Sequence, residues 1–239
     1  MNLIIDIGNT RAKLAVFKQD KLVFSLISDH DDINKNIDKL QEEYSLKNCI
    51  MSSVTNILTD VELKKFEKFV KLDHKTSVPF QNKYDTPFTL GVDRIALASA
   101  AANQYPKQNV LVIDSGTCIT YDFINSKNEY LGGAISPGIN LRYKSLNQFT
   151  ANLPLLEQAS YKLLGTDTKS SIHSGVLNGF IEEINGIIKQ YNSEFSNLTV
   201  VLTGGDTNFL AKKLKSSIFA NPNFLLEGLN SILIYNLNE

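Results

Sequence analysis

The sequence is poor in the residues that build disulfide frameworks and structural metal sites. Its 239 residues include two cysteines and three histidines, and the histidines show no ligand spacing such as HxxxH. Cys49 and Cys118 lie in apolar, strand-like stretches, which is typical of buried free thiols in a reducing compartment. We therefore expect neither a disulfide nor a structural zinc site.

The sequence also lacks an excess of charge of either sign, and it lacks long apolar runs. The chain has 24 Lys and Arg against 25 Asp and Glu, a net charge of −1, which gives no electrostatic footprint for nucleic acid or an anionic membrane. No apolar run approaches the length of a bilayer span, and no basic leader precedes an apolar stretch at the N-terminus. We therefore expect a cytoplasmic protein with no nucleic-acid or membrane partner, built as one large domain or two small ones.

The stretch at residues 2–17, NLIIDIGNTRAKLAVF, has the pattern of a β-hairpin with a polar turn. Gly8 lets backbone N–H groups approach a ligand closely, and the asparagine and threonine after it add hydrogen-bonding groups. Asp6 can hold a metal ion or a metal-bound water, and Arg11 or Lys13 can add positive charge. These groups suit a nucleotide phosphate with its cation. The alternative is an ordinary hairpin whose polar residues cap the turn.

A second copy of this pattern occurs at residues 109–123, NVLVIDSGTCITYDF. Asp6 and Asp114 each begin an Asp-x-Gly turn with a threonine close behind, and each turn lies between two strand-like runs. Repetition of such a unit about a hundred residues apart predicts two related halves that face one cleft. Two acidic turns that converge on one nucleotide would hold different phosphates with a cation between them.

A third motif, GVDR at residues 91–94, precedes an alanine-rich helix expected from residue 95. At the start of a helix, Arg94 and the free backbone N–H groups can meet an anion. Asp93 can accept a proton from a substrate hydroxyl. The alternative is that Asp93 only stabilises the helix dipole and that Arg94 is a solvated neighbour.

The remaining pattern predicts alternating strands and helices without long linkers. The sequence at residues 203–206, TGGD, indicates a glycine-rich strand-to-helix turn that can lie against a nucleotide, or simply a tight connection. Strands are expected at residues 21–27, 48–54, 130–136 and 198–202, and helices at residues 33–44, 56–70, 139–149, 170–191 and 224–237.

The motifs together resemble those of type III pantothenate kinases. DxGNT alone is shared with the wider actin-like ATPase group, whereas GxDR between two DxG turns, followed by GGxIxPG, is the specific part. The resemblance extends to the closing LEGL at residues 226–229 and so covers nearly the whole chain. The matching segments are DIGNT at 6–10, GVDR at 91–94, DSGT at 114–117, GGAISPG at 132–138 and TGG at 203–205.

This resemblance implies an α/β fold of two RNase H-like domains with mixed sheets flanked by helices and a cleft between them. Residues 1–105 would form the N-terminal domain with the first phosphate loop, and residues 106–239 the C-terminal domain with the second loop and the nucleotide-binding turn. The implied activity is phosphotransfer to an alcohol group, namely ATP-dependent phosphorylation of pantothenate to 4'-phosphopantothenate, the first step of coenzyme A biosynthesis. Members of the family are usually homodimers, with the site near the subunit interface.

The resemblance also implies roles for individual residues. Asp93 would be the general base, and Asp114 would hold a monovalent cation, potassium or ammonium, while Mg²⁺ would accompany ATP. The residues that would bind ATP are Asp6, Ile7, Gly8, Asn9, Thr10, Arg11, Ala12, Lys13 and Thr117. Those that would bind pantothenate are Tyr84, Gly91, Val92, Asp93, Arg94 and Thr168.

Three small departures from the family pattern, at Arg11, Val92 and Cys118, remove no group that the chemistry needs. Two other functions remain open. One is an actin-like kinase or phosphatase that acts on a sugar, acetate or polyphosphate. The other is a non-catalytic regulator that binds nucleotide or a protein partner. A third interpretation is that both DxG turns have a purely structural role.

Overall fold

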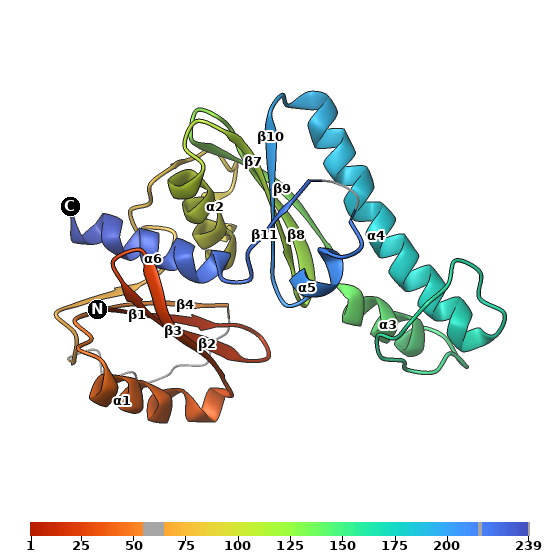
Figure 1. Ribbon diagram of the computed structural model, residues 1–239, viewed down its shortest axis with the longest axis horizontal. Coiled ribbons are helices and arrows are strands. Elements are labelled where there is room, and N and C mark those ends of the chain that lie inside the picture. The colour runs from red at the N-terminus through yellow and green to blue at the C-terminus, as the bar shows by residue number, and fades with distance from the viewer. Residues whose placement is uncertain (55–64, 215–216, 239) are drawn as a thin grey trace. The chain divides into compact units, whose positions relative to one another are not determined.

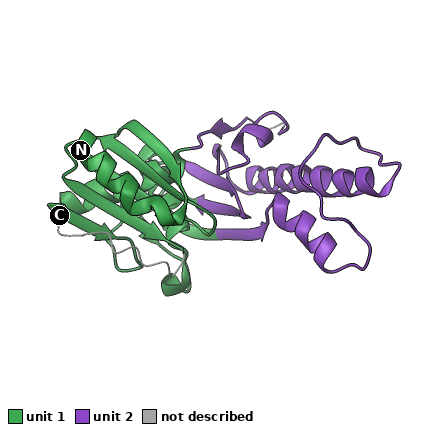
Figure 2. Cartoon of the chain, turned by 90° about the horizontal axis from the view of Figure 1, so that it is seen from below, with its two compact units in different colours: residues 1–107, 124–132, 223–239 green, residues 108–123, 133–222 purple. Residues whose placement is uncertain are grey.

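The computed structural model describes residues 1–54, 65–214 and 217–238. The chain forms two compact units, shown in different colours in Figure 2. Unit 1 comprises residues 1–107, 124–132 and 223–239, and unit 2 comprises residues 108–123 and 133–222. The division into two domains at residue 105 stays a prediction.

The first sheet has the strand order β3-β2-β1-β4-β5. Figure 1 labels its strands β1 to β4. β1 pairs antiparallel with β2, which confirms the predicted hairpin at residues 2–17, and β2 pairs antiparallel with β3. β4 lies parallel to β1, and β5 parallel to β4, so the sheet is mixed. Its strands are β1 (Asn2–Ile7), β2 (Ala12–Lys18), β3 (Lys21–Ser28), β4 (Asn48–Ser53) and β5 (Lys68–Lys71).

Helices cover both faces of this sheet, which explains why β1 is a continuous apolar run. Side chains of β1 that alternate along the strand, Leu3 and Ile5, pack with Ile33 and Ile37 of α1 (Ile33–Glu43), which follows a short 3₁₀ turn (His30–Asp32). The opposite face meets α2 (Val92–Gln104) and α6 (Phe224–Leu237), which also pack closely on each other. The buried sheet therefore fixes the position of the turn between β1 and β2.

The second sheet repeats the order of the first. Its strands run β11-β10-β7-β8-β9-β6, so β9-β8-β7-β10-β11 corresponds to β3-β2-β1-β4-β5, with β6 added at the edge. The two Asp-x-Gly turns consequently join the same pair of strands in each half, as the internal repetition of the sequence predicts. The strands are β6 (Gln81–Asn82), β7 (Asn109–Ser115), β8 (Cys118–Ile124), β9 (Glu129–Pro137), β10 (Leu198–Thr203) and β11 (Phe219–Ala220).

The core of unit 2 lies between this sheet and two helices, α3 (Ile139–Gln148) and α4 (Thr168–Glu194). The apolar stripe predicted for residues 170–191 is confirmed, because Ile172, Val176, Phe180 and Ile184 are buried in that core. A 3₁₀ turn (Pro87–Thr89) and the one-turn α5 (Thr207–Leu210) complete the helices of the described residues. The expected α/β fold with two mixed, helix-flanked sheets is thus confirmed.

Three local expectations are corrected. Residues 68–70 lie in strand β5 and not in the helix expected at residues 56–70, whose residues 55–64 lie outside the described part of the chain. Cys49 is buried as expected, and burial raises the pKa of its thiol, but the free thiol of Cys118 is exposed at the start of β8. The pattern also missed α5 and β11, because both are too short to show a period.

Candidate active site

The first turn (residues 6–13) has a fixed backbone and exposed polar side chains. The Gly8 N–H donates to the Arg11 carbonyl at 3.0 Å, and His30 Nε2 lies 3.1 Å from the Gly8 carbonyl oxygen. Arg11 Nε lies 3.6 Å from Asp29 Oδ1, and both side chains are mostly exposed. Ile7 and Ala12 are buried at the ends of the strands, while the exposed positions available to an anion are Asn9, Thr10 and Arg11.

Asp6 places a carboxylate in the buried strand beside this turn. The Ser52 hydroxyl on β4 donates to Asp6 Oδ1 at 2.7 Å, and Lys13 is the register partner of Asp6 on β2. Burial raises the pKa of Asp6, Ser52 and Lys13 oppose that rise, and the negative charge of Asp93 adds to it. The negative charge of Asp93, which is distant in the sequence, thus acts on the Asp6 carboxyl within unit 1. Such an arrangement favours a bound cation.

Asp93 and Arg94 lie in the first turn of α2, as the GVDR motif predicts. Asp93 Oδ1 accepts the Arg94 backbone N–H at 2.9 Å and is half-buried. A Cβ atom at Gly91 would lie 2.4 Å from this carboxylate oxygen, so any side chain at position 91 would displace the Asp93 carboxylate. Gly91 therefore lets the Asp93 carboxylate keep this position, whereas Val92 only begins the helix.

The Arg94 side chain lies beside two neighbouring tyrosine rings, whose centroids are 6.1 Å apart. Its guanidinium carbon lies 5.7 Å from the ring centroid of Tyr84 and 5.9 Å from that of Tyr130, and the side chain is buried, with 5% of the residue exposed. Stacking on aromatic faces suits a guanidinium group and fixes its direction. Tyr130 was not singled out in the sequence, where only the glycine pair that follows it suggested a close approach.

The second turn (residues 114–117) follows β7 and carries Asp114 at the position that Asp6 has in β1. Thr203 on β10 is the register partner of Asp114, as Ser52 is of Asp6 on β4. A Cβ atom at Gly204, where φ is +94°, would lie 2.3 Å from both Asp114 Oδ1 and the Ser115 carbonyl oxygen. Only glycine permits this approach. A carboxylate and a carbonyl oxygen therefore lie together beside the TGG turn.

Asp206 ties the TGG turn to the second turn. Ser115 Oγ donates to Asp206 Oδ2 at 2.9 Å, and the Asp206 N–H donates to the Ser115 carbonyl at 3.1 Å. Burial raises the pKa of Asp206, and the hydrogen bond from Ser115 lowers it. Thr117 is exposed at the tip of the second turn, and its carbonyl accepts the Gly138 N–H at 3.2 Å.

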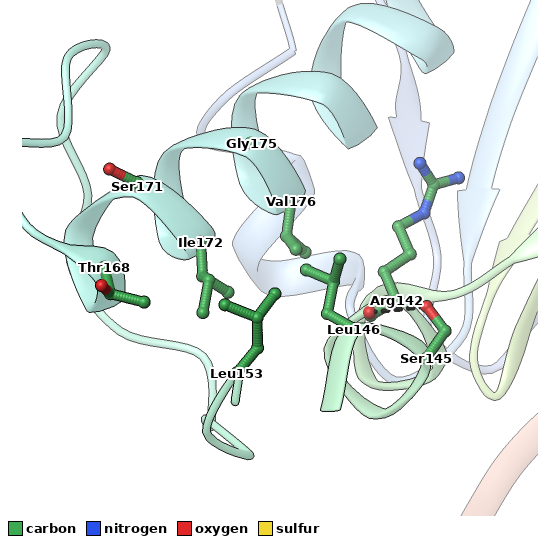
Figure 3. Close-up of a pocket in the computed structure, with 9 residues that line it drawn as sticks. All are labelled: Arg142, Ser145, Leu146, Leu153, Thr168, Ser171, Ile172, Gly175 and Val176. Atoms are coloured by element: carbon green, nitrogen blue, oxygen red, sulfur yellow. Dashed lines mark hydrogen bonds between the residues drawn. The ribbon is translucent and has the colours of Figure 1, made fainter. Parts of the chain in front are cut away.

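Thr168 is the first residue of α4 and belongs to unit 2, whereas Tyr84, Asp93 and Arg94 belong to unit 1. It lines a pocket of about 720 Å³ between α3 and α4, and Figure 3 shows Thr168 and Arg142 at opposite ends of that pocket. Within unit 1 the structure thus places Tyr84 beside Arg94, and the charge of Asp93 acts on Asp6. The other lining residues are Ser145, Leu146, Leu153, Ser171, Ile172, Gly175 and Val176.

The matching family model and two similar curated proteins carry the same family name. A family model described as type III pantothenate kinase matches residues 2–190. A protein from Christiangramia forsetii named type III pantothenate kinase is 51% identical, with 100% of both chains covered. Another from Flavobacterium johnsoniae with the same name is 48% identical, again with 100% of both chains covered.

Several solved structures are also similar to this chain in fold. A Campylobacter jejuni protein named as a member of the Baf family of transcriptional activators has a TM-score of 0.62 and 27% identity, covering 99% of this chain and 100% of its own. A glucokinase from an Antarctic psychrotroph has a TM-score of 0.53 and 14% identity, with 98% of both chains covered. The second likeness concerns the fold alone, which is that of actin-like kinases.

Proposed function

Because this chain belongs to the type III pantothenate kinase family, we propose that it transfers a phosphoryl group from ATP to the primary hydroxyl of pantothenate. The product is 4'-phosphopantothenate, and the reaction is the first step of coenzyme A biosynthesis. The observation that carries this proposal is the place of Asp93 at the start of α2, where its Oδ1 accepts the Arg94 backbone N–H and Gly91 leaves room for the carboxylate.

In the proposed mechanism Asp93 takes the proton of the substrate hydroxyl. Its carboxylate accepts a backbone N–H at the start of α2, and Gly91 leaves room for it, so its direction is set before substrate binds. Arg94, packed against Tyr84 and Tyr130, directs a fixed positive charge toward the carboxylate or another polar group of pantothenate. Positioning of this kind and charge stabilisation account for most of the catalysis of phosphoryl transfer.

The two turns bind the nucleotide in this proposal. Residues 6–13 supply backbone N–H groups, polar side chains and Lys13 to the transferring phosphate, and Thr117 contacts ATP from the second turn. Thr168, at the pocket between α3 and α4, is a further contact for pantothenate. The groups that make these contacts lie at the end of a strand or the start of a helix, where the backbone is rigid.

The oxygen atoms near each turn fit the cations that this reaction would use. Mg²⁺ is typically bound by one or two carboxylates together with substrate phosphates, and Asp6, beside the first turn, offers that ligand type. Asp114 Oδ1 and the Ser115 carbonyl oxygen, both close to Gly204, suit potassium or ammonium. Bound with ATP, Mg²⁺ would neutralise the charge on the transferred phosphate.

A homodimer is part of the proposal. Large apolar side chains between residues 149 and 164 of unit 2 are exposed, with Phe149 at 80%, Leu163 at 85% and Leu164 at 77%. Exposure of this extent favours a partner surface. We expect size-exclusion chromatography with light scattering to give twice the mass of one 26.6 kDa chain. The mass of one chain across the micromolar range would contradict it.

No helix of the described residues is long and apolar enough to span a membrane. The cytoplasmic location and the lack of a nucleic-acid partner stay predictions.

The activity is tested by ADP release from Mg-ATP, with and without pantothenate, in sodium and then in potassium buffer. We expect release only when pantothenate and potassium are both present. Pantothenate-dependent release in either buffer would support the kinase but contradict the role of Asp114. No such release from folded protein would contradict the proposal, and a panel of sugars, acetate and polyphosphate would then separate another kinase from a regulator.

A further inference from the structure

The second turn rests on the segment that precedes α3. The Gly138 N–H donates to the Thr117 carbonyl at 3.2 Å, and the Gly116 N–H donates to the Cys118 carbonyl at 2.9 Å. A Cβ atom at Gly138 would lie 2.3 Å from the Gly116 carbonyl oxygen and 2.6 Å from that of Thr117. The backbone at position 138 is therefore packed against the turn, and a shift of residues 136–138 would move Gly116 and Thr117.

Arg142 on α3 holds that segment with a fork of hydrogen bonds. Its Nε donates to the Pro137 carbonyl at 2.9 Å, and its Nη2 donates to Ser136 Oγ at 3.1 Å. The same Nη2 donates to Glu183 Oε2 on α4 at 2.5 Å, and the guanidinium carbon lies 4.8 Å from the centroid of the Phe180 ring. The planar guanidinium group can make these contacts together, whereas the single ammonium of a lysine cannot reproduce the fork.

Glu183 is itself held in place, so the fork has a rigid anchor. Tyr121, on β8 shortly after the second turn, donates its hydroxyl to Glu183 Oε1 at 3.3 Å. Burial, with Glu183 as a second cause, raises the pKa of Tyr121, so the phenol remains a donor at neutral pH. The Arg142 and Glu183 side chains are only 21% and 25% exposed, which limits screening by water. These three side chains link β8, α4 and α3 to residues 136–138, which support the turn.

From this arrangement we propose that Arg142 is a positioning residue for nucleotide binding: it sets the backbone of the second turn through residues 136–138. The inference rests on the proposed function, in which that turn contacts ATP. Arg142 lines the pocket that also holds Thr168, but at its opposite end, and it acts on ATP through the backbone of residues 136–138. Its loss should therefore weaken ATP binding through the Gly116 and Thr117 backbone and leave the pantothenate contacts of unit 1 unchanged.

The test compares Arg142→Gln, Arg142→Lys and Glu183→Gln with the wild type, using Lys144→Ala, an exposed position on the same helix, as the matched control. Dissociation constants for ATP are measured by calorimetry without pantothenate, followed by KM values for both substrates. We expect Arg142→Gln to raise both the dissociation constant and the KM for ATP about tenfold. This is the scale of one lost charge-assisted hydrogen bond. Arg142→Lys should give a smaller rise, and the KM for pantothenate should change less than twofold.

Three outcomes would overturn this inference. The first is an unchanged ATP dissociation constant in a folded Arg142→Gln protein. The second is a lowered melting temperature and kcat without any change in ATP affinity, because this pattern marks a contact that only stabilises the fold. The third is an equal effect in Lys144→Ala. Since ATP binding is measured without pantothenate, a failure of the wild type to phosphorylate pantothenate would contradict the proposed function without deciding the role of Arg142.

Discussion

Asp93→Asn is expected to lower kcat by about 10²-fold to 10⁴-fold, the range that a positioned general base contributes. The amide cannot take the proton from the pantothenate hydroxyl, so the nucleophile stays weak. It can still accept the Arg94 backbone N–H, which Asp93 Oδ1 accepts at 2.9 Å, so the start of α2 keeps its local structure. The affinity for ATP is therefore expected to stay within about twofold of the wild type, because the substituted group binds no nucleotide phosphate.

Steady-state kinetics and calorimetry with ATP check this prediction together. Asp20→Asn, the same change at an exposed position between β2 and β3, is the matched control and should behave as wild type. Near-normal turnover in Asp93→Asn would remove Asp93 from the base role. A raised KM for pantothenate with an unchanged kcat would instead make Asp93 a binding group.

Asp6→Asn is expected to lower activity by about 10²-fold or more, because a preorganised charge beside the transferred phosphate and its Mg²⁺ is lost. Here the apparent affinity for Mg-ATP should fall as well, which distinguishes this variant from Asp93→Asn. The Ser52 hydroxyl, which donates to Asp6 Oδ1 at 2.7 Å, can donate to the amide oxygen of the asparagine in the same way. A folded variant with wild-type kcat and Mg²⁺ dependence would contradict a role for Asp6 in the site.

The same substitution should stabilise the protein in metal-free buffer. The pKa of Asp6 is raised in the folded state, mainly by burial, so its charged form opposes folding at neutral pH. The contribution of such a group to stability is full below its ordinary pKa of 3.8 and is lost as the pH rises through the raised value. With EDTA at pH 7 we therefore expect the melting temperature of Asp6→Asn to exceed that of the wild type by at least about 2 °C.

The difference in melting temperature between Asp6→Asn and the wild type should become smaller as the pH is lowered through the raised pKa, because the wild-type carboxyl then becomes neutral too. This difference is measured by thermal unfolding at several pH values, monitored by circular dichroism. A variant that is less stable than the wild type at pH 7, or a difference that does not depend on pH, would show that Asp6 imposes no charge penalty on the folded protein.

Much of the site could be predicted because it lies in short contiguous motifs. The turn after β1 is visible in the sequence, since an apolar run, a glycine and a second apolar run fix a hairpin locally. GVDR could be placed at a helix start because the alanine-rich residues after it favour helix. The duplication was visible as two copies of one pattern, and the two sheets share one strand order as a result.

Other parts depend on residues that are distant in the sequence. Tyr130 could not be linked to Arg94, because the ring of one and the guanidinium of the other meet only after β9 and α2 have packed. Strand β5 was mistaken for the end of a helix, since a segment of four residues takes its conformation from pairing with β4 and not from a period of its own. The exposure of Cys118 follows likewise from its place at the end of a turn.

The sequence by itself determined the chemical groups of this protein and the local structures that carry them: a glycine-bearing hairpin with Asp6, its copy with Asp114, and a helix that begins at Asp93 and Arg94. Local propensity and hydrophobic pattern suffice for these. The tertiary structure alone decided which groups meet, because Arg94 lies beside Tyr84 and Tyr130, and Arg142 supports the second turn, through contacts between separate elements. Burial and close packing, which no local pattern encodes, set both those contacts and the pKa of Asp6.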